Sequence, residues 1–148
     1  YLSASTALKP ASPYAAAKAA AFFALGEHFR HAKVSFAWCR LFHLYGDGED
    51  AGRLVPYVRS RLEQGLPVDL TGGTQIRDYM NVRDAAAELV NVLLSERTGA
   101  VNVCSSVGTT VRALVEDIAD EYGRRDLLRF GVRAENFTDP PVVVGIRD

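Results

Sequence analysis

The spacing of apolar and polar residues divides the chain into helices and strands that alternate. Bulky apolar residues follow Ser12 and Pro13, which are typical of an N-cap and a first helical position, so we predict a helix over residues 13–31. The mostly apolar run of residues 34–41 is typical of a strand covered on both faces in a parallel sheet. We predict further helices over residues 53–64, 85–95 and 111–122, and short strands over residues 68–70, 77–82 and 101–104.

Single residues mark where several of these elements begin and end. Gly65 is a good stop for the second helix, and Asp84 and Thr110 are the predicted N-caps of the third and fourth. Strands that alternate with helices indicate an α/β protein. Only residues 34–41 and 101–104 have the composition of buried parallel strands, and a sheet needs more neighbours than these two.

Both ends of the sequence look cut. Tyr1 opens in a polar segment without a methionine, and the chain stops at Asp148 shortly after the strand-like residues 142–144. We therefore expect the sequence to be a piece of a longer enzyme, with the missing strands of the sheet encoded before Tyr1.

The chemistry most clearly suggested by the sequence lies at Tyr14 and Lys18. Residues four apart share one face of a helix, so the ammonium of Lys18 can lie beside the phenol of Tyr14 and favour its phenolate form. A phenol in that environment is a candidate general acid/base for a sugar hydroxyl or ketone. The first turn of the helix is an edge that ligands can reach, and the small residues that follow, Ala15 to Ala21 apart from Lys18, allow close approach by a neighbouring helix or a cofactor.

Composition narrows the class of protein and its partners. The chain has 148 residues, 48% of them apolar and 24% charged, as expected for one soluble domain. A net charge of −1 argues against nucleic acid and against a membrane surface as partners, and no apolar run approaches the ~20 residues of a membrane span. Cys39 and Cys104 lie in strand-like stretches and belong to no metal-type cluster, so we expect buried free thiols, no metal and a cytoplasmic location.

Five segments, in order along the chain, resemble the motifs of the extended short-chain dehydrogenase/reductase family, which comprises NAD-dependent epimerases, dehydratases and reductases of nucleotide sugars. Residues 10–18 (P-x-S-P-Y-x-x-x-K) resemble its active-site helix, and residues 40–49 resemble its R-x-x-N-x-Y-G-P-G loop. Residues 73–84 resemble the signature G-x-x-x-R-D-[FY]-x-x-V-x-D, which is the most specific match. Residues 53–56 and 101–110 resemble the segments on either side of that signature.

The resemblance covers only the C-terminal half of that family and implies how the chain is organised. It implies an α/β fold with part of a Rossmann-like parallel sheet, contributed by the last strands and helices, and a small α/β substrate-binding region. Residues 1–44 and 85–122 would belong to the NAD(P)-binding domain, and residues 45–84 and 123–148 to the nucleotide-sugar region. The Gly-rich turn that cradles pyrophosphate has no counterpart in this sequence.

The resemblance also implies roles for individual residues, with NAD or NADP as cofactor and a nucleotide-diphosphate sugar as substrate. Tyr14 and Lys18 would be catalytic. The cofactor would lie against these two residues and against Leu41, Phe42 and His43. The implied substrate-binding residues are His43, Arg53, Leu54, Arg77 and Arg133. Relatives often dimerise through the helix that bears Tyr14, so a homodimer is a further expectation.

Several positions depart from the family pattern. His43 stands where the loop commonly has Asn, and could contact substrate, titrate or simply pack. The catalytic Ser or Thr of the family belongs on a strand before the helix, and Ser3, Ser5 and Thr6 are too close to Tyr14 to replace it, so we interpret them as polar loop. Asp78 is expected to be a structural hydrogen-bond acceptor and forms no acid/base pair.

The sequence thus favours a nucleotide-sugar epimerase or reductase that uses NAD(P). A faint resemblance in the tail, Phe130 to Asn136, points the same way. A 4,6-dehydratase and a non-catalytic NAD(P)-binding scaffold remain alternatives. The 148 residues alone are expected to bind NAD(P) poorly and to catalyse nothing, because the phosphate cradle is absent.

Overall fold

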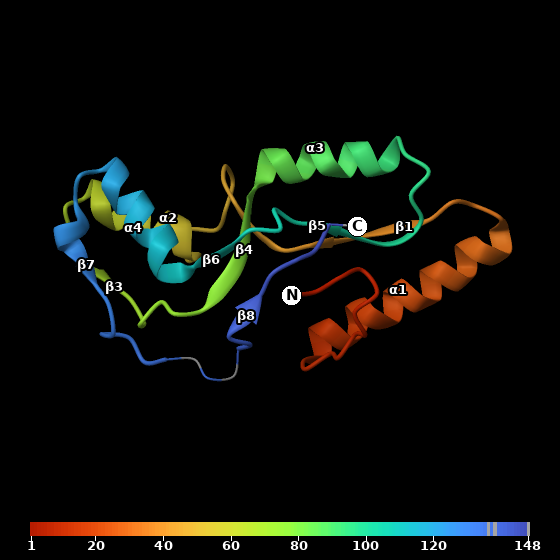
Figure 1. Cartoon of the computed structure of the whole chain (residues 1–148), viewed down its shortest axis with the longest axis horizontal. Coiled ribbons are helices and arrows are strands. Elements are labelled where there is room, and N and C mark those ends of the chain that lie inside the picture. Colours follow the sequence, from red (N-terminus) through yellow and green to blue (C-terminus); the bar gives the residue numbers. More distant parts are fainter. Residues whose placement is uncertain (136, 138, 148) are drawn as a thin grey trace.

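Two groups of elements lie at opposite ends of the molecule, and the strand β4 (Ile76–Asn81) runs between them (Figure 1). The computed structural model describes residues 1–135, 137 and 139–147. Asn136, which the sequence analysis used, lies outside the described residues. At one end β1 (Ala37–Leu41) and β5 (Gly99–Val103) form a parallel pair, with α1 (Pro13–Ala32) and α3 (Val82–Leu93) on its two sides (Figure 1).

At the other end, α2 (Leu54–Glu63) packs on α4 (Val111–Glu121) beside a short parallel pair, β3 (Val68–Asp69) and β7 (Leu128–Arg129). A 3-10 turn, η1 (Arg125–Leu127), precedes β7. Between the two ends, β4 pairs in parallel with β2 (His43–Tyr45) and β8 (Val142–Val143), and antiparallel with β6 (Gly108–Thr110). β4 is therefore the strand that connects the two halves of the structure.

The helix that carries Tyr14 forms as its sequence predicts. Ser12 Oγ accepts a hydrogen bond from Ala15 N at 3.1 Å, Pro13 occupies the first turn, and Lys33 closes the helix in the left-handed conformation. None of its 20 residues is buried. Aromatic contacts hold the helix to β1 and to the residue before it: Phe22 contacts Trp38 of β1, and Phe29 stacks on Phe36.

Most predicted elements are confirmed, and one cap is corrected. The helices and strands predicted from the sequence appear within a few residues of their expected bounds, and Thr110 caps α4 by accepting a hydrogen bond from Ala113 N. The prediction that Asp84 caps the third helix is wrong. Asn81 is the cap, because its side chain accepts from Arg83 N at 2.9 Å, and Asp84 lies in the first turn, where a carboxylate stabilises the helix dipole.

The predicted division into an NAD(P)-binding and a substrate-binding region stays a prediction, but the packing of one helix differs from it. Residues 111–121 of α4, which we grouped with the NAD(P)-binding part, share a buried core with α2 and β3 instead. The fully buried side chains Val58, Val68 and Val115 lie at its centre. A second, smaller core of Met80, Ala85 and Val103 lies beneath α3. Burial of an apolar helix face decides this grouping, since each helix packs where its apolar stripe is covered.

The strand β2 was not predicted. Residues 43–45 looked like the start of a loop, but they pair in register with residues 79–81 of β4.

None of the helices in the described part of the chain is both long enough and apolar enough to cross a membrane.

Candidate active site

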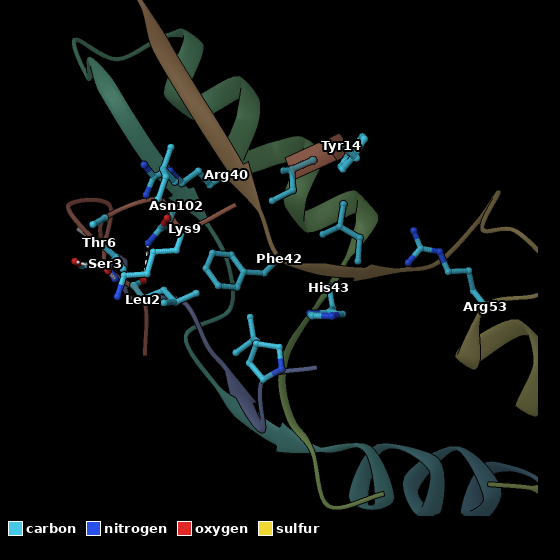
Figure 2. A pocket seen from close by; sticks show the side chains of 16 residues that line it. Leu2, Ser3, Thr6, Lys9, Tyr14, Arg40, Phe42, His43, Arg53 and Asn102 are labelled. Atoms are coloured by element: carbon cyan, nitrogen blue, oxygen red, sulfur yellow. Dashed lines mark hydrogen bonds between the residues drawn. The ribbon is translucent and has the colours of Figure 1, made fainter. Parts of the chain in front are cut away.

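An open groove of about 1110 Å³ follows the C-terminal end of β1 (Figure 2). Six segments of the chain form it: the N-terminal segment, the first turn of α1, the junction of β1 and β2, the loop before α2, β5, and the tail. Carboxyl ends of parallel strands are where open α/β sheets bind ligands. It is lined by Leu2, Ser3, Thr6, Ala7, Leu8, Lys9, Tyr14, Arg40, Leu41, Phe42, His43, Leu44, Arg53, Asn102, Pro140 and Val143.

The groove is electrostatically one-sided. Lys9, Arg40 and Arg53 contribute positive charge, and none of the described residues that line it is Asp or Glu. A concave surface lined by one sign of charge raises the local concentration of ligands of the opposite sign. The groove therefore suits an anionic ligand.

Tyr14 and Lys18 lie together, as their spacing predicts. The Nζ of Lys18 is 5.7 Å from the centre of the Tyr14 ring, within the range of a cation–π contact. Tyr14 is 73% exposed and lines the groove. Lys18 lines an adjoining hollow of about 340 Å³, whose wall also includes Tyr14, Trp38 and Arg40. The phenol is thus accessible from both hollows, with a cation beside it.

Hydroxyl groups of the N-terminal segment form part of the groove wall. Ser3 and Thr6 line it, and they form a turn in which Ser3 N donates to Thr6 Oγ1 at 2.9 Å. The segment is held from outside, since Arg40 donates to Ala4 O at 3.0 Å and Asn102 donates to Leu2 O at 2.8 Å. The sequence alone indicates only a polar loop for this segment. Its three hydroxyl side chains within residues 3–6 are the sequence signal for a polar wall of the groove.

His43 begins β2 and lies on the same groove wall. Its ring contacts that of Tyr79, its register partner in β4, edge to face with 5.7 Å between the centroids. Burial lowers the pKa of His43, and the nearby cations Arg77 and Arg53 lower it further. Burial likewise raises the pKa of Tyr79. His43 is therefore held in its neutral form.

Other predicted site residues divide into two groups. Leu41, Phe42 and Arg53 line the groove, as expected for residues at the end of β1 and the start of α2. Leu54 packs at the edge of the α2 core, and Arg133 stacks on the ring of Tyr57, with 4.6 Å from its Cζ to the ring centre. Neither of these two lines the groove.

Arg77 is placed differently from what its motif suggests. The residue is only 7% exposed, and its Nη1 donates to Ile76 O at 2.9 Å and to Pro141 O at 3.4 Å. It holds the tail next to Pro140, which lines the groove, and it does not line the groove itself. The direct contact with a phosphate that we predicted stays untested.

Asp78 is a hydrogen-bond acceptor at the centre of the structure. It is fully buried, and Oδ1 accepts from Ser105 N and Ser105 Oγ, both at 2.7 Å. Oδ2 accepts from Ser106 N at 3.0 Å and from Gly145 N at 3.1 Å. The carboxylate thus ties β4 to the loop after β5 and to the tail, as its expected structural role requires.

Gly145 makes a close contact that only glycine permits. A Cβ there would lie 2.5 Å from Cys104 Sγ and 2.9 Å from Phe42 Cζ. We expect Gly145→Ala to lower the free energy of unfolding by about 1–3 kcal/mol, because an extra methyl group in a packed region forces its neighbours apart. Urea unfolding, monitored by circular dichroism, measures the change in the free energy of unfolding.

Gly26→Ala is the matched control for that substitution. Gly26 lies inside α1 with only Phe36 near, at 3.9 Å, so alanine there should stabilise the protein by about 0.5–1 kcal/mol. A Gly145→Ala variant as stable as the parent would show that the tail does not pack as described.

Both cysteines are free, Cys104 buried and Cys39 half-buried. In the described part of the chain, no three His, Cys, Asp or Glu side chains are grouped as metal ligands would be.

Residues 2–104, most of the chain, match the NAD dependent epimerase/dehydratase family. The CDP-abequose synthase of Salmonella muenchen is 32% identical over 63 residues, which are 43% of this chain and 22% of that protein. The dTDP-glucose 4,6-dehydratase of an Actinoplanes species is 35% identical over 96 residues, which are 64% of this chain and 30% of that protein.

A solved structure has the same fold. The UDP-N-acetylglucosamine 4-epimerase of Methanobrevibacter ruminantium superposes with a TM-score of 0.88 at 24% identity, over 97% of this chain and 47% of its own length. The chain thus spans about half the length of that protein. The predicted α/β class, with part of a Rossmann-like parallel sheet, is confirmed. By the match over residues 2–104, the chain belongs to the NAD dependent epimerase/dehydratase family.

Proposed function

We propose that the protein carrying this chain is an NAD(P)-dependent enzyme that epimerises or reduces a nucleotide-activated sugar. The observation that carries the proposal is the position of Tyr14, an exposed phenol at the edge of a cationic groove with the ammonium of Lys18 beside it. The names of the relatives described above all refer to nucleotide sugars, which supports this class of substrate.

The groove fits the nicotinamide end of NAD or NADP. Leu41 and Phe42 provide apolar surface at the end of β1, in the same groove as the phenol of Tyr14. Lys18, in the adjoining hollow, offers an ammonium donor for ribose hydroxyls. When bound, NAD(P) supplies the hydride chemistry. Nothing in the chain corresponds to the Gly-rich pyrophosphate turn, so these residues would hold only the nicotinamide side.

The protein side chains then handle the proton and the charge. Tyr14 takes the proton of a sugar hydroxyl when its carbon is oxidised, and returns a proton when the ketone is reduced. The Lys18 ammonium lies beside the Tyr14 ring in both steps, with Nζ 5.7 Å from the ring centre. Arg53 lines the groove away from Tyr14 (Figure 2), and in this proposal its guanidinium binds the diphosphate.

Three further assignments from the resemblance stay predictions. Leu54, Arg77 and Arg133 lie outside the groove wall, so a contact of any of them with substrate is untested. A homodimer through α1 also stays a prediction; the helix buries none of its residues in this chain.

Turnover of nucleotide sugars tests the proposal. The purified full-length protein would be incubated with NAD+ or NADP+ and UDP-, dTDP- or CDP-linked hexoses, and separately with NADH or NADPH and the corresponding 4-keto sugars. Products would be followed by absorbance of the reduced cofactor and by NMR. We expect inversion of one hydroxyl or reduction of a 4-keto sugar. Absence of turnover with every pair, in a protein that binds NAD(P), would favour the non-catalytic scaffold.

A 4,6-dehydratase is the second candidate. The 35% identity with a dTDP-glucose 4,6-dehydratase over 96 residues favours it. NMR separates the two, because a dehydratase converts the hexose into a 4-keto-6-deoxy sugar with loss of water, whereas an epimerase conserves the composition of the sugar.

Arg53 is predicted to contribute affinity for the diphosphate. Its side chain makes no capping bond to α2, so Arg53→Ala should leave the helix intact. Loss of a charge-assisted hydrogen bond of about 1.5–3 kcal/mol should raise the Kd for dTDP or UDP about tenfold or more, measured by calorimetry. Arg30→Ala is the matched control, since Arg30 is an exposed arginine in the last turn of α1, far from Tyr14. Equal Kd values for the two variants would exclude Arg53 from the site.

A further inference from the structure

Asn102 lies where three segments of the chain meet. It belongs to β5, is only 4% exposed and lines the groove. Its Nδ2 donates to Leu2 O of the N-terminal segment at 2.8 Å and to Ile146 O of the tail at 3.0 Å. We call these two hydrogen bonds the Asn102 clamp, because one buried amide group connects β5 to both segments.

The chemistry of the amide suits its two acceptors. The N–H₂ group of an asparagine has two N–H bonds, and each can donate to one backbone carbonyl oxygen. A carboxylate of the same shape has no N–H to donate and would place a negative oxygen against those carbonyls. Asparagine at position 102 can therefore hold both segments, whereas aspartate cannot.

Apart from the clamp, few bonds join the N-terminal segment to the tail. Leu2 N donates to Val144 O at 2.8 Å, and Ile146 N donates to Leu2 O at 2.9 Å. These two bonds form an isolated parallel bridge between Leu2 and Gly145, outside the strands of the sheets. Segments with few hydrogen bonds open locally at low cost, so the two further bonds from Asn102 should decide how firmly this bridge is held.

Arg40 holds the same segment from the neighbouring strand. It is the register partner of Asn102 in β1, and its Nη1 donates to Ala4 O at 3.0 Å. Both side chains lie next to the N-terminal segment (Figure 2). Ser3, between the two anchored carbonyls, and Thr6 line the groove. The hydroxyl wall of the groove is therefore anchored from the pair of strands β1 and β5.

We propose that Asn102 is a positioning residue that holds the N-terminal segment and the tail as one preformed wall of the groove, and that this wall contributes affinity for the nucleotide sugar. The ligand named here rests on the proposed function. A wall that is ordered before the ligand arrives need not be ordered when it binds, which strengthens binding. The chemical step should not depend on Asn102, because Tyr14 is positioned by the separate cap of α1 at Ser12.

Exchange of backbone amide protons in the full-length protein tests the clamp. In Asn102→Asp and in Asn102→Ala, the amides of Leu2 and Ile146 should exchange at least about tenfold faster than in the parent, relative to the amide of Val115 in the buried core of α4. Val115 reports opening of the whole core, so the ratio isolates local opening. Asn91→Asp, at an exposed position of α3, is the matched control and should leave the ratio unchanged. An unchanged ratio in both Asn102 variants overturns the proposal.

Binding and kinetics test whether the wall serves the ligand. With UDP-glucose and dTDP-glucose as probes, calorimetry should give a Kd about tenfold higher or more for Asn102→Ala, at a temperature where the variant is folded. The KM of the nucleotide sugar that is turned over should rise similarly, while kcat stays within about threefold. A merely structural residue would lower stability without this separation of KM from kcat. An unchanged Kd despite faster exchange, or a loss confined to kcat, overturns the proposal.

Failure of the proposed function would give a different result. A parent protein that binds neither probe would overturn both the proposed function and the ligand assigned to this wall. The exchange ratio requires no ligand and no turnover, so it decides the Asn102 clamp separately.

Discussion

Replacing Tyr14 with phenylalanine is expected to lower kcat by about a hundredfold to ten thousandfold while leaving the affinity for NAD(P) nearly unchanged. The substitution removes only the hydroxyl. The ring beneath Lys18 remains, and the helix is unaffected, because Tyr14 is 73% exposed and the cap at Ser12 is independent of it. A loss confined to kcat is what removal of a proton donor and acceptor produces.

Steady-state kinetics with the nucleotide sugar that is turned over, together with calorimetry for the cofactor, measure this effect. Tyr122→Phe is the matched control. It removes a phenol of α4 that donates to Glu63 at 3.0 Å at the far end of the molecule, and it should leave kcat unchanged. If Tyr14→Phe retained turnover within a few-fold of the parent, the acid/base role would have to be abandoned.

Local patterns in the sequence are sufficient to predict the helix that carries Tyr14. Ser12 and Pro13 define its start through a cap and a restricted backbone, and both effects act within one turn. The strands at residues 34–41 and 101–104 could also be predicted, since both runs are apolar enough for a buried parallel strand; that residues 37–41 pair with residues 99–103 is a finding of the structure. Strand β2 could not, because three residues carry too little periodicity to distinguish a strand from a loop.

The composition of the groove depends on contacts that no local pattern contains. Tyr14, His43 and Arg53 come from α1, β2 and the start of α2, and the folded chain brings the three together on one groove. The motif that includes Arg77 implies a substrate-binding arginine, but it does not say to which face of β4 the side chain points. In the strand, alternate side chains point to opposite faces, and the tail packs over Arg77 through Pro141.

The sequence also does not predict which helix packs against α4. An amphipathic pattern predicts that a helix buries one face, but it does not say which neighbour covers that face. We grouped residues 111–122 with the parallel strands by their order along the chain. The structure pairs α4 with α2 because Val115, Ile118 and Ala119 complete the core around Val58. The end of the molecule that contains α2 and α4 is therefore built from segments that precede and follow β4 in the chain.

Asp78→Ala is expected to have the largest effect on stability, about 3–5 kcal/mol, because four donors would lose an acceptor that is itself fully buried. Asp78→Asn should lose less, since the amide keeps one acceptor oxygen and places an N–H₂ group against the remaining donors. Asp84→Ala, in the exposed first turn of α3, is the control and should cost about 0.3–1 kcal/mol.

Asp78→Ala should also weaken substrate binding, because the hydrogen bonds of Asp78 connect the core to two walls of the groove. Asp78 Oδ2 holds Gly145 N, and the adjacent Val144 O and Ile146 N pair with Leu2, which lines the groove. Loss of the carboxylate therefore loosens two walls at once, the N-terminal segment and the tail. Urea unfolding gives the stability, and calorimetry with UDP-glucose gives the affinity at a temperature where the variant is folded. If Asp78→Ala costs less than about 1 kcal/mol, or binds as tightly as the parent, the tail is not held to the groove by this carboxylate.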